Sequence, residues 1–202
     1  MKGNLQKTWE RFALNVGGAF ECSTGGSEFH KYEKYVIKFI YNGNKIVITI
    51  YFQSIPERGK SPFLVRYTRM DISFINKANV HFVVRKKGWV TSMIAIFTGT
   101  RVQSGYADFD KMFVVHGRPM ARVVEIFSQE TVRVSMIRLG DLHVSIINNK
   151  EFHDYFLDPG NDVIQINVNQ ILRSEEDIQR FFSLGILILA NTAAQNVRTF
   201  QK

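Results

Sequence analysis

The sequence has few of the residues that cross-link a chain or interrupt its helices and strands. A single cysteine, Cys22, excludes an intramolecular disulfide and any zinc site built from several cysteines. Only four prolines occur in 202 residues, each where we expect a helix or strand to begin or end. The longest unbroken apolar run, residues 186–190, is far shorter than the roughly 20 residues of a membrane-spanning helix.

The first ten residues hold no apolar stretch typical of a signal peptide. We therefore expect a soluble, cytoplasmic protein of bacterial character, for which a peripheral membrane contact stays open. Hydrophobic residues make up 45% of the chain and include 17 phenylalanines, enough for a sizeable core. We predict a single domain over residues 1–202, with two intimately packed halves (1–101 and 102–202) as the alternative.

Charge is unevenly distributed between these halves. Residues 1–101 hold 16 Lys/Arg and 6 Asp/Glu, whereas residues 102–202 hold 10 and 12, and the whole chain carries a formal charge of +8. A basic balance favours encounters with nucleic acid, anionic lipid or an acidic protein.

Local patterns predict the order of helices and strands. A helix over residues 5–16 should end at Gly17-Gly18, and strands 35–41 and 45–51 should form a hairpin around Asn42-Gly43. The hairpin register predicts the pairs Phe39 with Ile46, Ile37 with Ile48 and Tyr35 with Ile50, all on one face. Strands are predicted at 63–74, 80–85, 111–115, 142–147, 151–157 and 163–168, helices after Pro119 and over 130–139, and irregular chain over 88–107.

The last helix should begin after the capping sequence of residues 174–177 and be buried on most sides. Strands and helices come in runs, which indicates an α+β fold. We expect antiparallel sheet packed against an N-terminal helix, a central helix pair and a long buried C-terminal helix.

A short basic run is the best candidate for an interaction surface. Arg85-Lys86-Lys87 precedes Gly88-Trp89, where cations could meet phosphates and the indole could stack on a base. Such a run at a strand end also serves to protect a sheet edge. The candidate binding residues are Arg66, Arg69, Arg85, Lys86, Lys87 and Trp89.

Two carboxylates, Asp108 and Asp110, would share one face if they lie on a strand. That arrangement suits acid–base chemistry or a divalent cation, whereas on a loop the same residues cap backbone N–H groups, which is the commoner role. His143, His153 and Asp154 are near in sequence, but a three-residue loop in the predicted 142–157 hairpin places His143 opposite Tyr155 and the histidines on the surface. No phosphate loop or nucleophile motif is recognisable, and we expect no metal and no cofactor.

Several of these residues together resemble a family. Trp9, Thr68-Arg69 and Phe82 precede Gly99, Gly105, Asp108-Phe109-Asp110 and Phe113-Val114-Val115, and Arg133 and Leu142 follow. The pattern resembles uncharacterised bacterial proteins built on a domain of unknown function. Its Phe-Asp-x-x-Phe-x-Val core is similar to the soluble part of larger uncharacterised bacterial proteins with membrane helices. The resemblance implies no activity, cofactor or catalytic residue. The membrane association of the larger proteins implies a partner on the envelope side.

The sequence leaves three functional interpretations. The first is a non-catalytic binding module that uses the basic sheet surface to contact a protein or another anionic partner. The second is a nucleic-acid-binding protein using the same surface, and the third is an enzyme with a carboxylate site at Asp108 and Asp110. A homodimer stays open.

Overall fold

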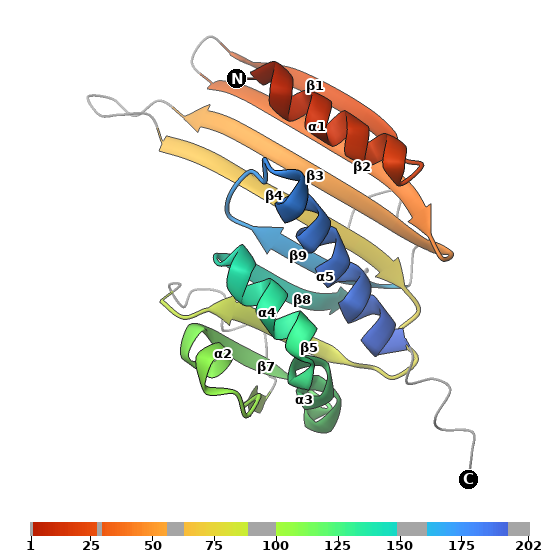
Figure 1. Cartoon of the computed structure of the whole chain (residues 1–202), viewed down its shortest axis with the longest axis vertical. Coiled ribbons are helices and arrows are strands. Elements are labelled where there is room, and N and C mark those ends of the chain that lie inside the picture. The colour runs from red at the N-terminus through yellow and green to blue at the C-terminus, as the bar shows by residue number, and fades with distance from the viewer. Residues whose placement is uncertain (1, 28–29, 56–62, 89–99, 149–160, 194–202) are drawn as a thin grey trace.

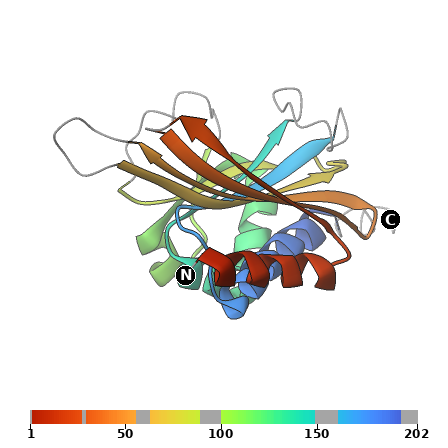
Figure 2. The same cartoon turned by 90° about the horizontal axis from the view of Figure 1, so that it is seen from above.

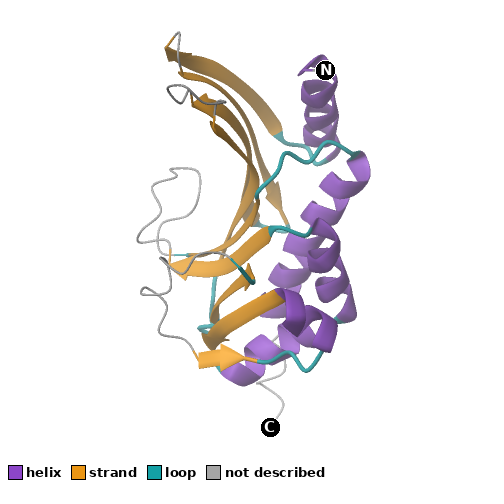
Figure 3. Ribbon diagram, turned by 90° about the vertical axis from the view of Figure 1, so that its left-hand side faces the viewer, coloured by secondary structure: helices purple, strands orange, loops and turns teal. Residues whose placement is uncertain are grey.

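The computed structural model describes residues 2–27, 30–55, 63–88, 100–148 and 161–193, which form one antiparallel sheet and five helices (Figure 1). Figures 2 and 3 show these helices against one face of the sheet, which we call the helix face. The opposite face carries no described helix, and we call it the open face. This arrangement confirms the predicted α+β class with the C-terminal helix packed on the sheet.

The sheet has nine strands in the order β1-β2-β3-β4-β9-β8-β5-β7-β6. They span Ala19–Ser27 (β1), His30–Tyr41 (β2), Asn44–Ile55 (β3), Phe63–Phe74 (β4), His81–Lys86 (β5), Thr100–Val102 (β6), Phe113–Arg118 (β7), Leu142–Asn148 (β8) and Asp162–Val168 (β9). β4 pairs with β9, and β5 lies between β8 and β7. The basic and acidic halves of the sequence therefore interleave within one sheet.

The hairpin of β2 and β3 has the predicted turn and register. Asn42 and Gly43 have φ angles of 47° and 79°, the left-handed backbone that a type I′ turn requires. Phe39 pairs with Ile46 and Ile37 with Ile48, and these side chains are buried on the helix face. Local turn chemistry and side-chain alternation thus agree on one register.

The helices span Lys2–Asn15 (α1), Ala107–Met112 (α2), Met120–Ser128 (α3), Glu130–Leu139 (α4) and Glu175–Ala193 (α5). α1 gives way to a turn at Gly17, whose φ is 67°. At the start of α5 the Ser174 hydroxyl accepts the Asp177 N–H at 3.0 Å, which confirms the predicted cap. None of the described helices is long and apolar enough to cross a membrane.

The core lies between the helix face and the helices. Phe82, Phe127 and Phe181 are fully buried there, and Trp9 anchors α1 by donating its indole N–H to the Leu172 carbonyl at 3.2 Å. The connection from β9 to α5 is held by Thr68, whose hydroxyl donates to the Gln170 carbonyl and accepts the Leu172 N–H. α1 and the connection that leads into α5 are thereby fixed to the same part of the sheet.

Three predictions of secondary structure need correction. Residues 107–112 form α2, so the strand predicted over 111–115 begins only at Phe113. β1 was not predicted, and β6 lies within the stretch expected to be irregular. β8 pairs with β9 and β5, so its neighbour is not the predicted 151–157 strand, whose residues lie outside the described ranges.

Candidate ligand-binding site on the open sheet face

Polar side chains cross the open face in two adjacent rows. Along each strand, every second side chain points to this face. Residues that pair in the strand registers place these side chains next to one another on adjacent strands. The first polar row consists of Thr49 on β3, Arg69 on β4, Asn167 on β9, His143 on β8 and Arg85 on β5. The second polar row consists of Asp71 on β4, Gln165 on β9, Ser145 on β8 and, beyond Val83, His116 on β7.

A buried carboxylate ties the two rows together on β4 and β9. Asp71 is 2% exposed and accepts Nε–H of Arg69 at 2.7 Å on one oxygen. Its other oxygen accepts the side-chain amide of Gln165 at 3.2 Å. Because a buried carboxylate is costly unless paired and hydrogen-bonded, this network fixes Arg69 in place. Arg69 therefore stabilises the sheet through Asp71 and also lines the open face.

Two buried polar atoms of the rows have no hydrogen-bond partner. Ser145 is 1% exposed and its hydroxyl oxygen is unpartnered, as is the buried amide oxygen of Asn167. A buried polar group without a partner costs about 1–3 kcal/mol, so a molecule that supplies a partner is bound more tightly. These two atoms mark the place on the open face where an added hydrogen-bonding group gains most.

His143 and Arg85 are the titratable and charged groups beside these atoms. His143 pairs with Asn167 on one side and with Arg85 on the other. Burial, and secondarily the positive charge of Arg85, lowers the pKa of His143 below 6.5, which makes the ring neutral at pH 7. Arg85 is partly exposed, and the described part of the chain offers it no carboxylate partner. A neutral imidazole next to a guanidinium that no described carboxylate neutralises suits an incoming anion.

The predicted basic surface is divided by the sheet. Alternation places Arg69 and Arg85 on the open face, where three inter-strand spacings, about 14 Å, separate them. Arg66 and Lys86 lie on the helix side. Lys87 is exposed just beyond β5. Trp89 lies outside the described residues. Consecutive residues of a strand point to opposite faces, so the Arg85-Lys86-Lys87 run does not form one patch with the other arginines.

Asp108 and Asp110 lie on helix α2 rather than on a strand. Asp110 accepts the backbone N–H groups of Ser104 and Gly105 at 3.1 and 3.2 Å, one on each carboxylate oxygen. Asp108 is exposed and borders a cavity of about 600 Å³ together with Lys86, Lys87 and Lys111. The two carboxylates therefore have separate surroundings. Asp110 binds backbone N–H groups, as the alternative interpretation expected, but it does so from a helix rather than from a loop.

Three tyrosines form a ladder across β2, β3 and β4 on the open face. The rings of Tyr32 and Tyr51 stack at 6.2 Å and those of Tyr51 and Tyr67 at 5.3 Å. Tyr32 also covers Gly25, where a Cβ atom would lie 2.8 Å from the phenolic oxygen. Because both faces of Tyr51 are taken up by its neighbours, it offers no ring face on which a base could stack.

Sequence reasoning missed the residues that define this site. His143 was expected on the surface opposite Tyr155, whereas it is partly buried opposite Asn167. The sequence pattern did not indicate a site at Ser145, Gln165 and Asn167, because single polar residues in alternating strands are typical of a solvated sheet face. The described residues contain no group of three His, Cys, Asp or Glu side chains arranged to hold a metal ion.

No family model, no curated protein and no solved structure matches this chain. The resemblance to uncharacterised bacterial proteins stays a prediction.

Proposed function

We propose that the protein is a non-catalytic binding module that takes a small anion at the centre of its open sheet face. We call the site the polar centre and define it by Arg85, His143, Ser145 and Asn167. The observation that carries the proposal is the pair of buried, unpartnered oxygens of Ser145 and Asn167 beside Arg85, which has no carboxylate partner among the described residues.

The donors of the polar centre match the oxygens of a carboxylate or phosphate. The guanidinium of Arg85, the hydroxyl of Ser145 and the imidazole N–H of His143 can each donate to an anionic oxygen. The Asn167 amide oxygen accepts, so a ligand that also carries a hydroxyl group would satisfy it. A hydroxylated small anion therefore fits better than a plain one.

Titration with inorganic phosphate, succinate and malate tests the proposal. The NMR signals of the His143 ring report binding in each titration. Malate differs from succinate by one hydroxyl and should bind more tightly. Arg85→Gln and Ser145→Ala should each weaken binding about tenfold, because hydrogen bonds to charged groups contribute about 1.5–3 kcal/mol. Arg138→Gln removes an exposed arginine at the end of α4 and should leave affinity unchanged.

Two results would overturn the proposal. One is the lack of any saturable shift with all three anions up to about 10 mM, an affinity too weak to be specific. The other is equal affinity of the Arg85→Gln variant and the wild-type protein, which would place the anion elsewhere.

Nucleic-acid binding is the second candidate. It is supported by the formal charge of +8 and by the cavity bordered by Lys86, Lys87 and Lys111. Fluorescence polarisation with short single-stranded and duplex DNA would reveal affinity that falls steeply with salt. Lys86→Gln together with Lys87→Gln should reduce that affinity, and no binding at low salt would remove this candidate.

A further inference from the structure

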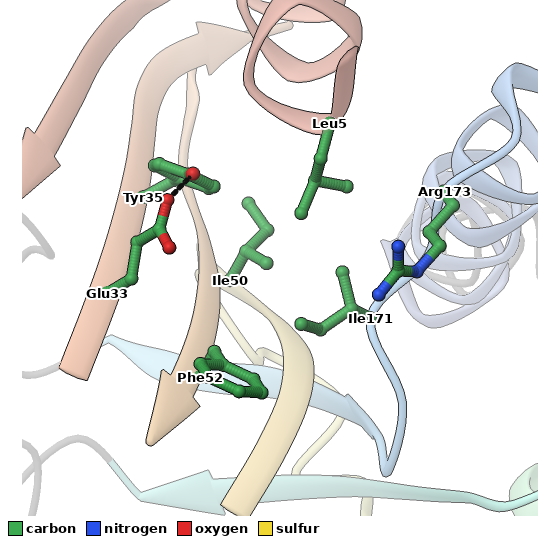
Figure 4. Close-up of a pocket in the computed structure, with 7 residues that line it drawn as sticks. All are labelled: Leu5, Glu33, Tyr35, Ile50, Phe52, Ile171 and Arg173. Atoms are coloured by element: carbon green, nitrogen blue, oxygen red, sulfur yellow. Dashed lines mark hydrogen bonds between the residues drawn. The ribbon is translucent and has the colours of Figure 1, made fainter. Parts of the chain in front are cut away.

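A second cavity lies on the helix side of the sheet, below the first turns of α1. Its volume is about 280 Å³, and Leu5, Ile50, Phe52 and Ile171 form apolar walls (Figure 4). These side chains come from α1, from β3 and from the connection between β9 and α5. Since Trp9 and Thr68 hold that connection, the walls are set by fixed parts of the fold.

The polar groups of this cavity lie on two opposite sides. On one side, the Tyr35 hydroxyl donates a hydrogen bond to the Glu33 carboxylate, drawn as a dashed line in Figure 4. Burial, followed by this hydrogen bond, raises the pKa of Tyr35 well above its usual value. The phenol thus stays protonated, and its donor is used by Glu33 rather than offered to a ligand.

Arg173 stands on the other side, across the apolar walls from Glu33 (Figure 4). Its side chain is exposed at the rim, and within the described ranges no carboxylate forms a salt bridge with it. An unpaired guanidinium beside an apolar cavity favours a molecule with an apolar body and a negative end. Charge complementarity therefore selects the orientation, with the anionic group at Arg173.

We propose that this cavity binds a medium-chain aliphatic carboxylate, with its chain among Leu5, Ile50, Phe52 and Ile171 and its carboxylate on Arg173. A cavity of about 150 Å³ is known to hold benzene, so 280 Å³ accommodates roughly ten or eleven carbon atoms. The site is independent of the polar centre, which lies on the other face of the sheet.

Decanoate is the probe, used below the concentration at which it forms micelles and compared with decanol. The methyl signals of Leu5, Ile50 and Ile171 should shift saturably with decanoate. Arg173→Gln should weaken decanoate binding about threefold, as expected for an exposed ion pair, and leave decanol affinity unchanged. Arg138→Gln, the matched exposed arginine, should have no effect.

Filling the cavity gives a second arm. Leu5→Trp should abolish the binding of both probes, provided that its circular dichroism and melting curve match those of the wild type. If Leu5→Trp fails to fold, a spin-labelled decanoate is added to the wild-type protein instead. Its binding site is then located by the relaxation of the same methyl signals.

The proposal is overturned if decanoate shows no saturable binding, if the shifts map elsewhere, or if Arg173→Gln binds decanoate as the wild type does. Ser145→Ala should bind decanoate normally. Failure of the polar centre to bind phosphate would therefore leave this result unaffected, and failure here would leave the polar centre standing.

Discussion

At the scale of the residue, Asp108 and Asp110 show how contacts separate neighbours of identical chemistry. Asp110→Ala should lower the free energy of unfolding by about 1–2 kcal/mol, because the N–H groups of Ser104 and Gly105 lose their acceptors. Asp108→Ala should change it by less than about 0.5 kcal/mol, since this side chain is exposed. Urea unfolding of both variants makes the comparison, and equal losses would contradict the assignment.

His143 predicts how stability depends on pH. Its pKa is lowered in the folded protein, so below pH 6.5 the unfolded chain binds more protons than the folded one. The free energy of unfolding should therefore fall as the pH decreases from 6.5. Unfolding measured at several pH values should show a smaller decrease for His143→Gln than for the wild type.

The same titration links to the proposed ligand. An anion next to His143 favours the charged imidazolium, so binding of an anion that keeps its own charge over the range, such as sulfate, should tighten as the pH falls. An affinity independent of pH would place the anion away from this ring. In the unfolding experiment, an unchanged dependence of stability on pH in His143→Gln would contradict the buried position of His143.

At the scale of the element, two glycines mark where backbones or helices approach the sheet closely. A Cβ atom on Gly117 in β7 would lie 2.8 Å from the His81 carbonyl oxygen, from Phe82 Cβ and from Val123. Gly117→Ala should cost about 1–3 kcal/mol, because backbone cannot move aside.

Gly185 in α5 is the matched comparison. There an added Cβ would meet the end of the Met70 side chain, which can rotate, and alanine favours helix by up to about 1 kcal/mol. We expect Gly185→Ala to destabilise less than Gly117→Ala in the same unfolding assay. The reverse order would show that the buried Met70 cannot adjust.

Local sequence predicted the elements whose signals are self-contained. The β2–β3 hairpin has Asn42-Gly43 at its turn, and α5 has its cap at Ser174. The α2 helix was missed because six residues provide too little periodicity to distinguish it from the strand that follows. β6 is three residues long, and β1 contains Gly25-Gly26, which usually interrupts strands.

At the scale of the whole molecule, the interleaved sheet predicts one cooperative unfolding transition. Seven residue pairs join β4 to β9, and β5 is enclosed by β8 and β7, so neither half can keep its sheet without the other. Far-ultraviolet circular dichroism and tryptophan fluorescence should give coincident urea curves. Two separated transitions would instead favour two halves that fold independently.

The sequence by itself determined the alternation of each strand, the hairpin turn, the helix caps and the uneven charge. These features depend on residues close in the chain, whose interactions are local. Only the tertiary structure decided that Arg85, His143, Ser145 and Asn167 lie together, because they belong to β5, β8 and β9. The pairing of strands distant in sequence is set by burial of their shared apolar face, and the polar face follows from it.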